Sequence, residues 1–334
     1  MKTDRKIYLV IGIGLITALF LLFLVKLQTS FYEDFYKVAP VTKVSPQESS
    51  KQPTTTLMFT GDVMLDRGVE EIIEKHEEDF EFPFLKIEDY LQEADLLFGN
   101  LESIVSDKGY QVKPTYPFRA DPAAKEGLKK ADFDVLSCAN NHSLDYGETA
   151  LKDGVVKLTQ SGIDCAGAGL KQKAYSPVIK QKNDTKVAYL AYTYLAPDNW
   201  KATENKVGIA WLNEKNLKQG IQKAKEKSDL VVVSFHFGEE YEKKPNSHQK
   251  HYSHLAIDSG ADLVIGHHPH VIQPVEQYKD GWIAYSLGNF VFDQDFSEET
   301  MRGLVLRVSA KKGEIKKVTS KEVTMNKYFQ PTID

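Results

Sequence analysis

The chain has 334 residues, of which 42% are hydrophobic and 27% charged, a composition typical of a folded protein and not of a disordered one. A formal net charge of −5 excludes a strongly basic protein that would bind nucleic acid through bulk electrostatic attraction. The two cysteines, Cys138 and Cys165, are too few for a disulfide framework. Their apolar surroundings favour buried free thiols, with a bridge between them as the alternative.

The first predicted element is a membrane-spanning helix. Residues 7–25 form an uncharged apolar run that is long enough to cross a bilayer. Basic residues precede this run and acidic residues follow it, so the positive-inside rule predicts a cytoplasmic N-terminus and an extracellular C-terminal part. A cleaved signal peptide is the alternative, but the run is longer than a usual signal-peptide core and has no clear cleavage site after it. We therefore expect residues 1–26 to be a cytoplasmic stub and a single-pass signal anchor in the cell membrane.

A linker and an α/β domain are predicted to follow. Residues 27–55 lack helical periodicity and contain prolines, serines and a threonine run, which predicts an extended extracellular linker. From residue 56 to residue 334, short apolar runs alternate with amphipathic stretches, as in an α/β domain whose ligand loops follow the carboxyl ends of the strands. The predicted strands are 57–60, 95–99, 133–137, 186–192, 230–235, 263–266, 282–286 and a closing hairpin of 303–310 and 315–325. The predicted helices are 70–76, 123–131, 151–161, 217–227 and 247–259.

Polar residues follow five of these strands at the point where each strand ends. Their carboxylate, amide and imidazole groups are ligands that borderline divalent metals accept. Each group alone has a structural explanation, since an aspartate at a strand end often caps a helix. Three histidines within four positions have no use in packing, and the five junctions together predict a metal site. The residues are Asp62, Asn100, Glu102, Asn141, His142, Asp145, His236, Glu240, Tyr241, His267, His268 and His270.

In their order, these motifs resemble the calcineurin-like metallophosphoesterase superfamily, and they are more similar to the CapA family, which is associated with poly-γ-glutamate capsule synthesis. The resemblance covers about residues 56 to 295 and implies a four-layer α-β-β-α sandwich of metallophosphoesterase type. The motifs that carry it are Gly61-Asp62-Val63-Met64, Asn100-Leu101-Glu102, Asn140-Asn141-His142, Leu144-Asp145-Tyr146-Gly147, His236 through Tyr241, Gly266 through Val271 and Ser286 through Phe290.

The resemblance also implies a role for individual residues. Asp62 would bind one metal ion and Glu102 would bridge two. Asn141, His236 and His268 would bind the second ion, with His267 as the alternative to His268. His270 would bind the first ion. His142 would be the catalytic residue, as proton donor or transition-state stabiliser. Candidates either for binding metal or for supporting its ligands are His267, Asn100, Asp145, Glu240, Tyr241 and Asn289.

Two departures from the phosphoesterase pattern affect the expected cofactor. Met64 stands where that pattern has a histidine, and Glu102 replaces the usual aspartate. Thioether sulfur is a poor ligand for hard divalent ions, so the first ion would bind weakly or be absent. We therefore expect one or two divalent ions, with Mn, Fe or Zn favoured.

Other charged residues are weaker candidates. Arg67 and Arg119 are candidates for binding an anionic substrate, with surface salt bridges as the alternative. Histidines 248, 251 and 254 recur at three-residue intervals on a predicted helix, so we expect one helix face and not metal ligands.

The resemblance implies that the protein takes part in the synthesis or export of an anionic capsule polymer, poly-γ-glutamate, beside the subunits of a membrane polymer synthase. Two alternatives remain: an extracellular metal-dependent phosphoesterase or polymer hydrolase, and a non-catalytic partner of the synthase. Whether the protein is an enzyme is left open; an active form would be a metal-dependent hydrolase.

Overall fold

The computed structural model describes residues 54–113 and 115–333. The predicted anchor lies outside these residues, as does all of the predicted linker except its last two positions. Within the part of the chain that is described, no helix is both long enough and apolar enough to span a membrane.

The first of two large sheets contains the strands nearest both ends of the described chain. Its order is β18-β17-β16-β1-β2-β5-β6, and β15 also pairs with β1. Strands β2, β5, β6 and β15 run parallel to their neighbours, while β16 is antiparallel to β1. The bounds are β1 Thr55–Val63, β2 Leu96–Leu101, β5 Val135–Ser137, β6 Asp164–Ala166, β15 Asn289–Val291, β16 Arg302–Lys311, β17 Glu314–Met325 and β18 Pro331–Thr332.

The second large sheet has the order β13-β14-β12-β11-β9-β8, and its four central strands are parallel. Its bounds are β8 Val178–Lys182, β9 Thr185–Thr193, β11 Leu230–His236, β12 Leu263–His267, β13 Val275–Tyr278 and β14 Gly281–Ala284. Two small sheets pair β3 (Ile104–Val105) with β4 (Arg119–Ala120), and β7 (Ala168–Gly169) with β10 (Gly208–Ile209).

Helices connect the parallel strands of each sheet. They are α2 Arg67–Lys75, α3 Glu88–Leu91, α4 Ala124–Lys130, α5 Gly147–Gln160, α6 Lys171–Ala174, α7 Glu214–Lys225 and α8 Ser247–Asp258, with 3₁₀ turns η1 Phe82–Phe84 and η2 Asp198–Trp200. Helix α8 begins with a capping box, in which the side chains of Asn246 and Gln249 satisfy each other's backbone N–H groups.

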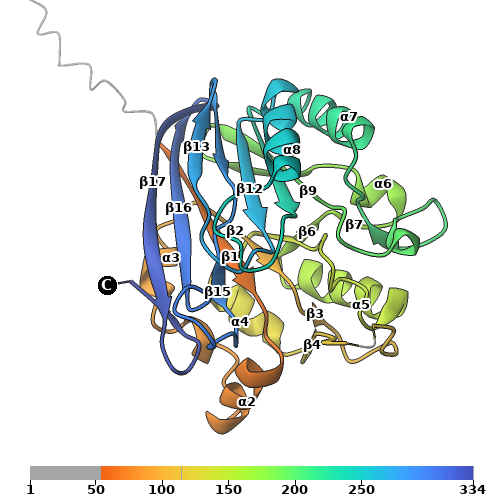
Figure 1. Cartoon of the computed structure of the whole chain (residues 1–334), viewed down its shortest axis with the longest axis vertical. Coiled ribbons are helices and arrows are strands. Elements are labelled where there is room, and N and C mark those ends of the chain that lie inside the picture. Colours follow the sequence, from red (N-terminus) through yellow and green to blue (C-terminus); the bar gives the residue numbers. More distant parts are fainter. Residues whose placement is uncertain (1–53, 114, 334) are drawn as a thin grey trace, which may run out of the picture. The chain divides into compact units, whose positions relative to one another are not determined.

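The side chains of β11 show how the layers stack. Val231 and Val233 pack with Leu217 and Ile221 of α7, whereas Val232 belongs to the core shared with the first sheet. This alternation is the two-residue period of a strand with one face on each core. Strand β1 lies against β12, and β5 and β6 lie against β9, so the two sheets face each other. Figure 1 shows α7 and α8 covering the second sheet, with α4 and α5 beside the first.

This arrangement confirms the predicted α-β-β-α sandwich. Each predicted strand and helix has a counterpart, although α5 begins at Gly147, ahead of the predicted start. The hairpin turns at Lys312 and Gly313, both with positive φ, as a tight turn between twisted strands requires. The two-residue strands were not predicted, and neither were β6, β8, β13 and β15, because such short segments carry little periodicity.

The predicted free thiols are confirmed. Cys138 and Cys165 are buried and unbridged.

Candidate metal centre

The site lies where parallel strands of both sheets end. In the first sheet, Asp62 of β1 pairs with Asn100 of β2 on one side and with Asn289 of β15 on the other. In the second sheet, His236 at the end of β11 pairs with His267 at the end of β12. All five side chains are fully buried. The two facing sheets therefore present carboxylates and imidazoles toward one another.

Asp62, Glu102 and His236 form the first candidate ligand group, with donor atoms that all lie within 4.8 Å of one another. The Asn100 amide donates hydrogen bonds to Asp62 Oδ1 (2.8 Å) and Glu102 Oε1 (3.2 Å). Asn141 Oδ1 lies 2.8 Å from His236 Nε2. Asn100 thus orients both carboxylates, and Asn141, predicted as a ligand, contacts the imidazole of another predicted ligand.

Glu240, His268 and His270 form the second candidate group, again with donor atoms within 4.8 Å of one another. His270 links the two groups, since its Nδ1 lies 3.3 Å from Asp62 Oδ2 and its Nε2 lies 4.0 Å from Glu102 Oε2. His270 Nδ1 also lies 2.9 Å from Asn289 Oδ1. Both His268 and His270 have positive φ values, a backbone strain that is common where side chains are aimed at a functional site.

Several polar atoms at this junction are buried without a hydrogen-bond partner. They are Glu102 Oε2, His268 Nδ1 and both ring nitrogens of His267. Buried polar groups in folded proteins are nearly always paired, so such a concentration needs a cause. His267 Nδ1 is 3.2 Å from Asp62 Oδ1, which places His267 beside the first group while His268 belongs to the second. Both candidates for the ambiguous histidine position are therefore at the site.

The electrostatics fit a divalent cation. Burial lowers the pKa of His268 to about 3 and holds the pKa of His236 well below its usual value, so both rings are neutral and each has one nitrogen lone pair. Burial opposes ionisation of Asp62, but the rings of His267 and His270, at 3.2 and 3.3 Å from its carboxylate oxygens, outweigh it and keep the pKa of Asp62 well below normal. Burial and then the Asp62 charge raise the pKa of Glu102. A cation between the two carboxylates would remove this conflict.

His142 lies at the wall of the cavity beside these groups. Its Nδ1 is 2.7 Å from Asp145 Oδ2, and its ring stacks on Phe118 with centroids 3.8 Å apart. Burial, followed by the nearby Lys113 charge, lowers the pKa of His142 well below its usual value. Burial raises the pKa of Asp145 to about 7. The predicted catalytic histidine is thus neutral and held in one orientation.

Lys113 is a site residue that the sequence analysis missed. Its Nζ lies 3.2 Å from His142 Nδ1 and 3.9 Å from Asp145 Oδ1. It belongs to the loop between β3 and β4 and follows no strand end. That loop is fixed at the site by its backbone, since Val112 N donates to Asp145 O at 2.7 Å. No motif or spacing in the sequence signals this contact.

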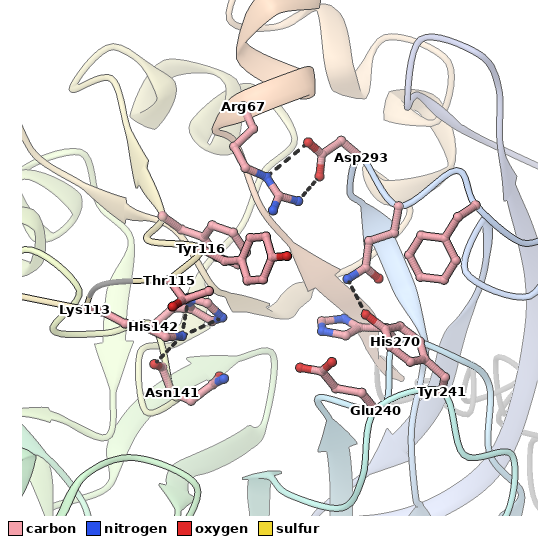
Figure 2. Close-up of a pocket in the computed structure, with 13 residues that line it drawn as sticks. Arg67, Lys113, Thr115, Tyr116, Asn141, His142, Glu240, Tyr241, His270 and Asp293 are labelled. Atoms are coloured by element: carbon pink, nitrogen blue, oxygen red, sulfur yellow. Dashed lines mark hydrogen bonds and ion pairs between the residues drawn. The ribbon is translucent and has the colours of Figure 1, made fainter. Parts of the chain in front are cut away.

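An open cavity of about 710 Å³ connects the site to solvent. Figure 2 shows Asn141 and His142 on one side of it, facing Glu240 and His270 on the other. Arg67 also lines the cavity, pairs with Asp293 and lies 4.6 Å from the centroid of Phe118.

Other candidates lie apart from this cavity. Arg119 does not line it; its guanidinium lies 4.2 Å from the centroid of Tyr146. On α8, His251 pairs with Glu214 and His254 with Glu276, which agrees with the prediction that these histidines form a helix face.

The fold and site together define an α/β sandwich with a candidate divalent-metal centre between its two sheets. Residues 56–294 match the family described as "Bacterial capsule synthesis protein PGA_cap", and the chain belongs to this family, which confirms the predicted resemblance.

Two relatives have names that refer to capsule or PGA biosynthesis. The capsule biosynthesis protein CapA of Bacillus anthracis is 36% identical over 271 residues, which cover 78% of this chain and 66% of that protein. The PGA biosynthesis protein CapA of Bacillus subtilis is 35% identical over 251 residues, covering 74% and 66%. The chain thus matches slightly less than two thirds of the length of either relative. Among solved structures, a phosphatase from Mycoplasma pneumoniae aligns with a TM-score of 0.49 at 16% identity, covering 82% of this chain and 94% of that one.

Proposed function

We propose that this protein takes part in the synthesis or export of an anionic capsule polymer, poly-γ-glutamate, through a divalent-metal centre at the junction of its two sheets. Membership of the capsule-synthesis family and the names of the two Bacillus relatives support the biological role. The observation that carries the metal dependence is the set of buried, unpaired ligand atoms that two sheets bring together.

The residues present form two groups of ligands, which would hold one or two divalent ions. Asp62, Glu102 and His236 form one, and His268 and His270 with Glu240 form the other. When bound, a divalent ion supplies Lewis acidity, which polarises a carbonyl or phosphoryl oxygen or activates water. Mn, Fe and Zn suit this mixture of carboxylate and imidazole donors.

His142 is the proton-transfer residue of the proposal. With Nδ1 held by Asp145, the neutral ring is able to accept a proton at Nε2 and then return it. Arg67 lines the same cavity, where its guanidinium is shared with Asp293, and Lys113 adds a second cation to the wall. These features favour a catalytic role, as a metal-dependent hydrolase, over a purely structural one.

The proposal also includes the location of the protein. The uncharged run at residues 7–25, with basic residues before it and acidic residues after it, supports a single-pass anchor with the domain outside the cell. Anchoring would keep the domain beside the synthase subunits from which the polymer emerges, and so raise its effective concentration there.

The test uses a capsule-forming strain whose own copy of the gene is replaced by variants. A His236→Ala/His270→Ala double variant should lose bound metal and surface polymer. A His251→Ala/His254→Ala double variant, which removes two histidines from α8, should keep both. Normal polymer production by the first variant would contradict the metal-dependent role.

A His142→Ala variant distinguishes a catalytic role from a role as a metal-dependent binding partner of the synthase. Retained metal with lost polymer indicates catalysis. Retained metal with normal polymer indicates a metal-dependent binding partner of the synthase. Cell fractionation of the same strains, with protease added to intact cells, tests the anchor and the outward orientation.

A further inference from the structure

We propose that this protein binds its polymer as an extended chain, in a groove that runs from the metal centre into a second cavity beside Trp200. This inference rests on the proposed function, because it takes the ligand to be the anionic polymer named there. It adds a second binding site, which apart from Asn141 is formed by residues outside all the predicted motifs.

The second cavity adjoins the first. It has a volume of about 470 Å³ and shares two lining residues, Lys113 and Asn141, with the cavity of about 710 Å³ at the metal centre. Its remaining wall is formed by Val112, Leu195, Pro197, Asn199 and Trp200. Asn141 also contacts His236, so the boundary between the cavities is itself part of the candidate metal centre.

The second sheet determines where this cavity lies. Residues 195–200 follow β9, whose last residue, Thr193, pairs with His236 at the end of β11. Thr193 Oγ1 donates a hydrogen bond to His236 O at 2.8 Å and accepts one from Leu195 N at 3.0 Å. The loop after β9 is therefore tied directly to a candidate metal ligand. The groove follows the carboxyl edge of the sheet from β12 through β11 to β9.

The second cavity combines one cationic group with a largely apolar wall. Lys113 Nζ stands between the two cavities, and its nearest carboxylate oxygen, on Asp145, is 3.9 Å away. Beyond Lys113, the walls of the second cavity are formed mainly by Val112, Pro197 and Trp200. A glutamyl unit has a carboxylate and a short run of methylene groups, which suit a lysine and an apolar wall respectively.

Exposed apolar side chains surround the same groove. Tyr116 and Phe296, at the first cavity, are 71% and 64% exposed, and Val112, at the second, is 55% exposed. Exposed apolar groups gathered around a cavity mark a binding surface. The first cavity alone has the size of a small-ligand site. A small ester would not need the second cavity, whereas an extended polymer chain would occupy both.

The experiment compares synthetic γ-glutamyl oligomers of two lengths on the full-length, metal-loaded protein. One oligomer has about three units and the other about ten, the longer exceeding the reach of either cavity. Isothermal titration should show the longer oligomer binding at least about tenfold more tightly than the shorter one, a modest gain for a second set of contacts.

Asn199→Glu places a negative charge in the second cavity on an exposed residue, and Val112→Glu does the same from the loop between β3 and β4. Both should remove the gain in affinity with length. Gln181→Glu makes the same change in charge on the exposed edge strand β8, at the opposite end of β9, and should keep the gain. Thermal unfolding of each variant confirms that it is folded.

Equal affinity for both oligomers, or an equal loss of affinity in all three variants, would contradict the proposed groove. Neither result would contradict the proposed function. The absence of any oligomer binding would also overturn the groove. The proposed function is judged separately, by polymer production in strains that carry the metal-site variants.

Discussion

Glu102→Gln tests the electrostatic description of the metal centre. Glu102 is 1% exposed, and burial, followed by the charge of Asp62, raises its pKa well above 4.5. A carboxyl whose folded pKa is raised opposes folding once the pH exceeds its unfolded value, so its contribution worsens as the pH rises above about 4.5. In the wild type, Asn100 donates a hydrogen bond of 3.2 Å to Glu102. Glutamine keeps an oxygen that accepts this hydrogen bond, and it carries no charge. The metal-free variant should therefore be at least as stable as the wild type at pH 7.

The same substitution should remove most of the stabilisation by metal. An ion present at 100 times its Kd stabilises the native state by about 2.7 kcal/mol. For a domain of this size that is a rise in Tm of roughly 5–10 °C. Replacing a charged ligand with an amide should weaken binding by about a hundredfold, which leaves about 0.4 kcal/mol, or about 1 °C, at the same concentration of metal.

Scanning calorimetry, with chelator and then with Mn, Fe or Zn, measures both effects. Glu226→Gln, an exposed change at the end of α7, is the control and should behave as the wild type. A full metal-induced shift in the Glu102→Gln variant would show that Glu102 is not a ligand. A metal-free variant that is several kcal/mol less stable would show that the carboxylate is charged and required for folding, and would refute the electrostatic reasoning.

Three further predictions concern other parts of the domain. Burial raises the pKa of Glu70 from 4.5 to about 7, so wild-type stability should fall between those pH values, and Glu70→Gln should flatten that part of the denaturation profile. Gly61→Ala would place a Cβ 2.0 Å from the backbone oxygen of Gly288, so urea unfolding should show a loss of about 3 kcal/mol, and an unchanged midpoint would contradict the close approach. The thiols of Cys138 and Cys165, 4% and 2% exposed, should react with a thiol reagent only after unfolding.

The strand-end residues were predictable because parallel strands present their carboxyl ends at one edge of a sheet. Apolar runs identify β1 and β2 of the first sheet and β11 and β12 of the second, and within each sheet the polar groups that follow neighbouring runs lie near one another. That reasoning places Asp62 near Glu102, and His236 near the histidines at the end of β12, while the joining of these two pairs in one site follows from the family resemblance. It does not say which of His267 and His268 faces which group, because the backbone leaves the strand there with a positive φ at His268.

Contacts between a loop and a distant strand end were not predictable. Lys113 reaches His142 because backbone hydrogen bonds from Val112 and Lys113 to Asp145 O hold their segment over the end of β5. Such contacts depend on the path of a loop, which no periodicity records. Asn289 shows the intermediate case: its motif was recognised, but its pairing with Asp62 through the three-residue strand β15 was not.

The order of strands in the first sheet has a consequence for how the chain folds. Strand β1 pairs with β16 in a register that joins Thr55 to Ala310, so the earliest described strand gains one of its neighbours only after nearly the whole chain is present. Such long-range pairing is slow to form. The junction around Asp62 also includes β15, so we expect it to be among the last parts of the sheet to form. Binding of the proposed metal ion would then require that strands from both ends of the described chain have paired.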